Sequence, residues 1–175
     1  MKLTWFGGTT LRAYVGGEIV VIDPDGAPEG IDRAELLAGA DRAVALRGDA
    51  TVPLVDPAGW RPKTVRPLDE AGPVEIVRIG PSALLVAGIG ESPLVVLGAD
   101  APPRFGRWAD GAVIVLASGG DALVAEATVL LDLARPRLLA LAVDEQTLDL
   151  SVAALSEHLD GAGLVSLEPG LALEV

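Results

Sequence analysis

Two stretches near the start decide the fold: Lys2–Thr10, which reads KLTWFGGTT, and Ile19–Pro24, which reads IVVIDP. Each is a short run of apolar and β-branched residues that ends in residues typical of a turn, Gly-Gly in the first and Asp-Pro in the second. Leu11–Val15 lies between them, and Gly16-Gly17 marks a hairpin turn. The pattern predicts an opening β-meander with strands over Leu3–Phe6, Leu11–Val15 and Glu18–Ile22.

The rest of the chain predicts a second meander followed by a β-α-β arrangement. The strands of the second meander are expected over Val74–Ile79, Ala83–Ala87 and Leu94–Leu97. Both meanders end in an acidic loop, Asp23-Pro24-Asp25 and Gly98-Ala99-Asp100, as an internal duplication would. Further strands are expected over Arg42–Leu46, Ala112–Ala117, Leu138–Val143, Leu164–Leu167 and Leu171–Val175, and Gly48–Pro73 is expected to be mostly loop.

Three helices are expected from capping signals. Asp32, followed three residues later by Glu35, predicts a short helix that ends at about Leu37. Asp121 is the expected cap of a helix that ends at Ala134, and Arg135-Pro136 stops it. The third helix is expected over Ser151–Leu159, with His158 in its last turn, where a cation complements the helix dipole.

Length and composition limit the function classes. The 175 residues fit a single domain, residues 1–175, and no apolar run is long enough to span a membrane. We expect no leader peptide, because the chain begins directly with a strand pattern. The net charge of −12 repels phosphate groups and anionic lipids, so we expect neither nucleic-acid nor membrane binding.

The apolar content says more about partners and location. Half of the residues are hydrophobic but only 3% are aromatic, and the mean hydropathy is +0.46. Such an excess predicts apolar surface beyond the core of one copy, and therefore a homo-oligomer, with a dimer as the simplest form. The absence of cysteine fits a cytoplasmic location. The chain also has no Asn and only one Gln, which fits heat adaptation or GC-rich coding equally.

The order of these features resembles the metallo-β-lactamase superfamily, in its branch of short lactonase-like and phosphodiesterase-like hydrolases. Trp5-Phe6-Gly7 and Ile22-Asp23-Pro24 match the start of that family. Later matches are the strand at Ala40–Leu46, the second meander, the helix-Pro-strand segment from Glu126 to Leu141, and the turn Leu167–Gly170. The resemblance implies an αββα four-layer sandwich of metallo-β-lactamase type, here shortened.

The resemblance also implies a zinc site, and its ligands are missing. Gly8 stands where the family has its first histidine, and the stretch that aligns with the family's His-x-His-x-Asp-His motif is Leu46–Val52, whose only carboxylate is Asp49. Asp100 falls near the family's bridging aspartate, and Asp144 replaces its last histidine. Zinc sites are usually built from imidazole and thiolate ligands, but this chain has one His and no Cys. We therefore expect no zinc and no catalytic residue.

Three functions remain open from the sequence. The first is a catalytically inactive metallo-β-lactamase-like domain that acts through oligomerisation, a protein partner or a small ligand. The second is a hydrolase with a carboxylate-only Mg²⁺ or Mn²⁺ site made by Asp49, Asp100 and Asp144, possible in chemical terms because such cations prefer oxygen ligands. The third is an unrelated α/β domain with a structural role. The first two predict that these acids and Asp23 gather at one edge of the sandwich.

The sequence predicts no nucleophilic site, and its three tryptophans are given a structural role. The chain has no Gly-x-Ser-x-Gly motif, and a single histidine leaves little room for a nucleophile with its base. Trp5, Trp60 and Trp108 are expected to fill the layers between sheets and helices rather than to form a ligand site.

Overall fold

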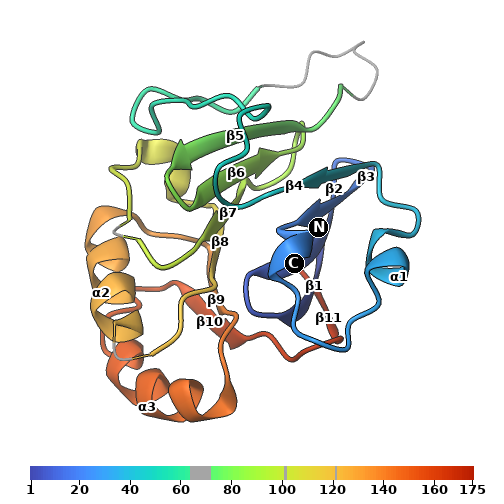
Figure 1. Cartoon of the computed structure of the whole chain (residues 1–175). Helices are drawn as coiled ribbons and strands as arrows, with labels where there is room; N and C mark the ends of the chain where they lie inside the picture. Colours follow the sequence, from blue (N-terminus) through green and yellow to red (C-terminus); the bar gives the residue numbers. More distant parts are fainter. Residues whose placement is uncertain (64–71, 101, 121) are drawn as a thin grey trace.

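The computed structural model describes residues 1–63, 72–100, 102–120 and 122–175. In this part of the chain the strands form two sheets (Figure 1). The first sheet has the order β11-β1-β2-β3-β4 and contains the predicted opening meander. Its strands are β1 (Lys2–Gly7), β2 (Thr10–Val15), β3 (Glu18–Ile22), β4 (Arg42–Val44) and β11 (Ala172–Glu174). β4 is parallel to β3, whereas the other neighbours are antiparallel.

The second sheet has the order β10-β9-β8-β7-β6-β5. The predicted second meander is confirmed as the antiparallel strands β5, β6 and β7, and β8, β9 and β10 then continue the sheet in parallel. These strands are β5 (Glu75–Gly80), β6 (Ala83–Ala87), β7 (Leu94–Leu97), β8 (Val113–Leu116), β9 (Leu138–Leu141) and β10 (Gly163–Ser166).

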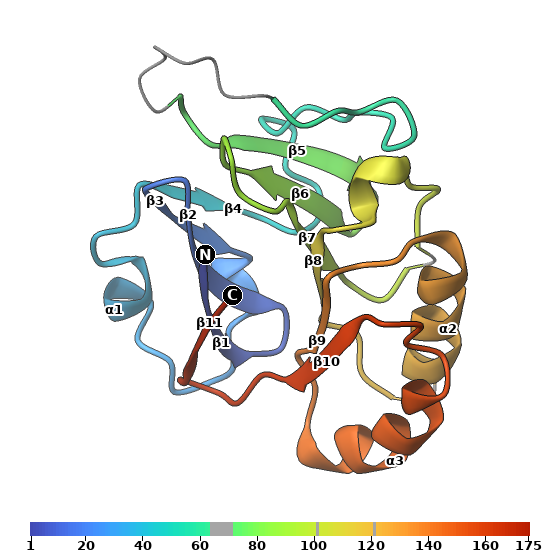
Figure 2. The same ribbon diagram turned by 180° about the vertical axis from the view of Figure 1, so that it is seen from behind.

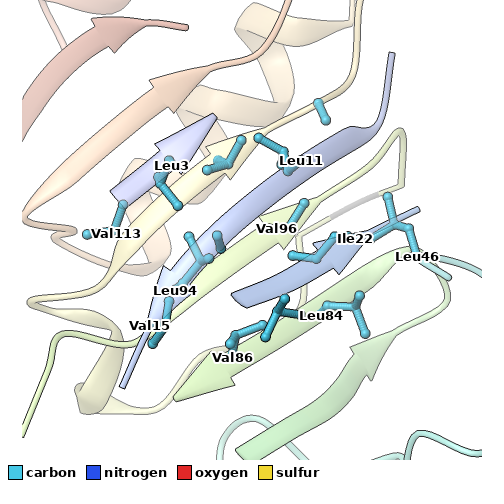
Figure 3. Packing of buried hydrophobic residues seen from close by; sticks show 14 of the residues in the cluster. Leu3, Leu11, Val15, Ile22, Leu46, Leu84, Val86, Leu94, Val96 and Val113 are labelled. Carbon is cyan, nitrogen blue, oxygen red and sulfur yellow. The ribbon is translucent and has the colours of Figure 1, made fainter. Parts of the chain in front are cut away.

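The two sheets pack face to face over one apolar cluster. Leu3, Leu11 and Ile22 from the first sheet meet Leu84 and Val96 from the second (Figure 3). These five side chains are fully buried, and burial of such a side chain stabilises the folded state by about 1.5–3 kcal/mol. The aliphatic residues that dominate the sequence therefore fill the interface between the sheets.

A second cluster covers the outer face of the second sheet. It includes alternate residues of the same strands, such as Leu85 and Val95, and the buried faces of α2 (Leu123–Leu133) and α3 (Glu145–Ser156). Because the second sheet is covered on both faces, its central strands are apolar on both faces. The short helix α1 (Arg33–Leu37) lies on the outer side of the first sheet (Figure 2). The described residues thus form an α/β sandwich.

The tryptophans fill the core, as predicted, but not all in the expected layer. Trp60 and Trp108 pack edge to face, with ring centroids 4.9 Å apart, in the cluster on the outer face of the second sheet. Trp5 instead belongs to the cluster between the two sheets. The loop that carries Trp60 and the short 3-10 helix η2 (Arg107–Ala109) that carries Trp108 therefore cover part of this sheet.

The helix boundaries need one correction. The prediction of a helix over Ser151–Leu159 is wrong at both ends, because α3 begins at Glu145 and ends at Ser156. The reason for the early start is Asp144, whose carboxylate accepts a hydrogen bond from the Thr147 backbone N–H and caps the helix. His158 consequently lies just beyond α3 and not in its last turn.

The other helix predictions fare better. α1 is capped by Asp32, as predicted, and α2 ends one residue before Ala134. The predicted cap Asp121 lies outside the described residues, as does the part of the predicted Gly48–Pro73 loop from 64 to 71. The described part of that loop, residues 48–63 and 72–73, forms turns and one isolated bridge between Leu54 and Arg78.

Candidate functional site

The candidate site is the edge where several strands of both sheets end. The parallel strands β7 and β9 end at the same edge of the second sheet, and Asp100 and Asp144 follow them. The loops after β3 and β4 in the first sheet carry Asp23 and Asp49. The two groups of loops meet at Gly98, since a Cβ atom on this residue would lie 3.2 Å from Leu46 Cδ2.

The acidic side chains on these loops do not converge on one point. Among the described residues, no group of three or more His, Cys, Asp or Glu side chains has an arrangement that could hold a metal ion. Each of the predicted acids instead makes local contacts of its own. The sequence thus identified the loops, but the side chains of Asp49, Asp100 and Asp144 are not brought together as ligands.

Asp23 links three segments of the first sheet. Its carboxylate accepts hydrogen bonds from the Thr9 hydroxyl and from the Leu46 backbone N–H, the latter at 3.3 Å. Its backbone carbonyl accepts a hydrogen bond of 2.7 Å from the Thr10 hydroxyl, and its backbone N–H donates one of 2.7 Å to the Val44 carbonyl. The residue has a positive φ of 52°, a conformation that is uncommon for residues other than glycine. Asp23 is therefore a structural hub.

Gly8 lies against the turn that follows Asp23. Its φ is +53°, and a Cβ atom built on it would lie 2.7 Å from the Gly26 carbonyl oxygen. Any side chain at this position would therefore require the backbone of the turn Pro24–Gly26 to move. The position at which the resemblance would place a first histidine therefore has no room for a side chain unless this turn moves.

Asp100 has two partners, and one of them is a cation. Its carboxylate accepts a hydrogen bond from the buried Ser82 hydroxyl, and Arg47 Nη2 lies 3.7 Å from Asp100 Oδ2. Arg47 belongs to the stretch that aligns with the family's histidine motif. A guanidinium group therefore stands beside the carboxylate that the resemblance places near a metal-bridging aspartate.

Asp49 is held by its own loop. The Thr51 hydroxyl and backbone N–H both donate to Asp49 Oδ1, at 2.5 and 2.9 Å. These hydrogen bonds lower the pKa of Asp49 below its ordinary value, and the bond from the hydroxyl has the larger effect. The carboxylate is thus ionised and only partly exposed, and both of its hydrogen bonds close a turn within its own loop.

Asp144 serves as the cap of α3. Hydrogen bonds from the backbone N–H and the hydroxyl of Thr147, both 2.9 Å long, stabilise its charged form and lower its pKa. A negative charge is also favourable at a helix N-terminus. This capping role accounts for an aspartate at position 144 without a metal ion. The cap was not predicted from the sequence, because the resemblance assigned Asp144 the place of a metal ligand.

The donors present do not fit a zinc ion. The resemblance seen in the sequence would place imidazoles at Gly8, within Leu46–Val52 and at Asp144, and none of these positions holds one. His158 lies exposed beyond α3, with its backbone N–H bonded to the Leu155 carbonyl. A nucleophile with a histidine base is likewise not assembled among the described residues. Arg47 and Ser82 are the site residues that sequence reasoning missed, and only their contacts across the fold identify them.

Comparisons with known proteins support the fold. No protein-family model matches the chain, and no curated protein matches it in sequence. Among solved structures, the chain is similar to Igni18, a metallo hydrolase from the hyperthermophilic archaeon Ignicoccus hospitalis, with a TM-score of 0.59 and 16% sequence identity. The match covers 99% of this chain and 98% of that chain, so the two share a fold over their whole length. The chain thus has the fold of a metallo hydrolase.

Among the described residues, no helix is long and apolar enough to cross a membrane.

Proposed function

We propose that this chain is a metallo-β-lactamase-like αββα domain that does not act as a zinc hydrolase and works by binding a partner or a small ligand. The observation that carries the proposal is the closed position at Gly8. A side chain there would collide with the Gly26 carbonyl, so the first zinc ligand is not merely absent but has no room. The contacts of Thr9 and Asp23 fill the neighbouring space with hydrogen bonds.

Arg47 supports the same proposal by charge. A metal ion bound at Asp100 would have to displace the guanidinium or share the carboxylate with it, and two like charges at this distance repel. The residue types also argue against activation of water. In zinc hydrolases the bound ion lowers the pKa of a water molecule, and this site lacks the ligands that would hold the ion. We infer that the loops at this edge of the sheets have the arrangement of a hydrolase site, but that their side chains do not support zinc chemistry.

A carboxylate-only Mg²⁺ or Mn²⁺ hydrolase is the competing function. It would need Asp49, Asp100 and Asp144 to leave their present partners, which are Thr51, Ser82 with Arg47, and Thr147. No contact among the described residues favours that rearrangement. The competing function therefore enters the experiment as the alternative outcome.

Thermal unfolding with added Zn²⁺, Mn²⁺ or Mg²⁺, together with elemental analysis of protein purified without chelator, tests the proposal. A site filled at a hundred times its Kd adds about 2.7 kcal/mol to the stability. For a domain of this length, that free energy raises the Tm by roughly 5–11 °C. We expect no such shift, no stoichiometric zinc, and no turnover of lactone, phosphodiester or β-lactam substrates.

Two controls separate the outcomes. Asp100→Asn removes the carboxylate, and Asp132→Asn removes an exposed acid on α2 that is not among the candidate ligands. A metal-induced shift or a turnover that Asp100→Asn abolishes and Asp132→Asn leaves intact would establish the hydrolase instead. One tightly bound zinc per chain would also overturn the proposal.

Self-association is one form of binding included in the proposal. Large apolar side chains are exposed on several elements, among them Leu54 at 70% and Leu150 at 71%. The high mean hydropathy points in the same direction. Light scattering at tens of micromolar protein should give the mass of a dimer. A monomer mass at that concentration would restrict the proposal to other partners.

A further inference from the structure

Strand β10 ends the second sheet with an open edge. Gly163 and Leu167 donate their backbone N–H groups to Arg137 and Leu141, toward β9. In a parallel ladder alternate residues face the same neighbour, so the N–H and C=O groups of Leu164 and Ser166 face away from β9. Within the described residues no strand lies beyond β10, and Figure 2 shows it as the outer ribbon at that end of the sheet.

A groove adjoins the end of this edge. It has a volume of about 530 Å³ and lies between the start of α3 and the turn after β10. Its apolar wall includes Val143, Leu148 and Leu171, and Ser166 of β10 lines it as well. The open edge and the groove are therefore continuous at Ser166.

Two carboxylates belong to the same groove. Glu145 comes from the first turn of α3, and Glu168 from the turn that follows β10. Both residues are exposed, and neither forms an ion pair or a side-chain hydrogen bond within the described part of the chain. An apolar groove with two such acids is complementary to a side chain that has an apolar stem and a cationic end, as arginine and lysine have.

We propose that β10 binds an extended cationic segment of a partner protein, which adds as a strand to the open edge and places a basic side chain in the groove. Strand addition uses backbone hydrogen bonds for affinity and a pocket for alternate side chains for specificity, and both are present here. A side chain on the same face of the sheet as Ser166 points toward the groove. This inference rests on the proposed function, because it specifies the partner of a binding domain.

The charge of the chain favours a basic partner over a second copy. Each copy carries a net charge of −12, so two copies repel each other, whereas a basic segment is attracted. A dimer formed through apolar side chains on other elements is compatible with the proposal. A dimer formed through β10 is not, because it would occupy the edge.

The test is a titration of the ¹⁵N-labelled protein with a capped peptide that alternates arginine and valine over seven residues. Amide chemical shifts locate the contact, and their concentration dependence gives the Kd. We expect the shifts to concentrate in residues 163–171 and at the start of α3. The double variant Glu145→Gln/Glu168→Gln should raise the Kd about fivefold, since each partly exposed ion pair contributes a modest amount.

Matched controls make the result decisive. The double variant Glu29→Gln/Asp132→Asn removes the same charge from other exposed positions and should change the Kd less than twofold. A peptide with N-methylated alternate residues cannot complete the ladder and should bind at least tenfold more weakly. A peptide with glutamate in place of arginine should not bind.

Several outcomes would overturn the inference. They are no shift at millimolar peptide, shifts scattered over the acidic surface, an equal loss in both double variants, or full binding by the N-methylated peptide. A dimer contact mapped to β10 would also overturn it. The readout is peptide binding rather than metal content or turnover, so its failure is distinct from failure of the proposed function.

Discussion

The two meanders follow the same path but use their terminal aspartates differently. Each has three antiparallel strands and then a parallel fourth, and each has a register shift in its first hairpin, at Trp5/Gly7 and at Arg78/Gly80. Each third strand leads to an aspartate whose carboxylate accepts a hydrogen bond from a hydroxyl in the turn of that hairpin. The aspartate is Asp23 in the first half and Asp100 in the second. The topology therefore repeats, as the sequence suggested.

The difference lies in what else each aspartate does. Asp23 holds the ends of β3 and β4 together through several hydrogen bonds. Asp100 remains partly exposed and pairs with Arg47 across the junction of the two sheets. The comparison teaches that the same position in a repeated motif can become part of the scaffold in one half and stay available for chemistry in the other. The predictions below test this contrast.

The largest effect is expected from Asp23→Ala. The change leaves the Leu46 N–H and the Thr9 hydroxyl without a partner, and each lost bond of this kind costs about 1–3 kcal/mol. We expect the free energy of unfolding to fall by about 3 kcal/mol in urea titrations. Asp100→Ala is the matched variant and should cost less, about 1–2 kcal/mol, because only the buried Ser82 hydroxyl loses its partner while the exposed Arg47 can be solvated. Equal losses would remove the distinction between the two acids.

Gly8→Ala should be next in size. Both Gly8 and Gly17 have positive φ values, 53° and 88°, but only Gly8 has a backbone atom close to the added Cβ. The change at Gly17 should cost about 1 kcal/mol through strain alone, and that at Gly8 about 2–3 kcal/mol. The difference between the two losses of stability measures how strongly the turn at Gly26 resists displacement by a side chain at Gly8. Similar costs at both positions would show that the turn yields.

Trp5→Phe and Trp108→Phe compare the halves at a finer level. Trp5 Nε1 donates to the Gly8 carbonyl at 3.0 Å, and Trp108 Nε1 donates to the Pro57 carbonyl at 2.7 Å. Each substitution removes one hydrogen bond and some packing, so each should cost about 1–2 kcal/mol in chemical unfolding. A loss near zero at Trp108 would mean that its loop does not depend on this bond.

The smallest effect is expected from Asp144→Asn and appears only at higher pH. The folded-state pKa of Asp144 is lowered from 3.8 by its bonds to Thr147, so its charge stabilises the fold above that value. This stabilisation is lost as the pH falls through the lowered pKa. The Tm of the variant should therefore be slightly below that of the parent at pH 7, and the two should converge in strong acid. A difference that persists in acid would indicate a role other than charge.

Local patterns predicted the strands well, because runs such as those around Leu84 and Val113 are apolar on both faces and bounded by turn residues. The start of α3 was missed although Asp144 and Thr147 carry an ordinary capping signal, since the resemblance gave Asp144 another role. Arg47 with Asp100, and Thr9 with Asp23, pair residues that are far apart in the chain. The first pair depends on the packing of the two sheets and the second on the pairing of strands within one sheet, and neither arrangement is encoded by local sequence.

Strand β11 has a consequence for the order of folding. It completes the edge of the first sheet by pairing Ala172–Glu174 with Lys2–Thr4, residues that lie far apart in the sequence. The first sheet is therefore complete only after this distant pairing has formed, and its apolar face is covered only when the second sheet packs on it. Contacts of such long sequence separation slow the search for the native state. Completion of the first sheet is thus expected to be among the late steps of folding.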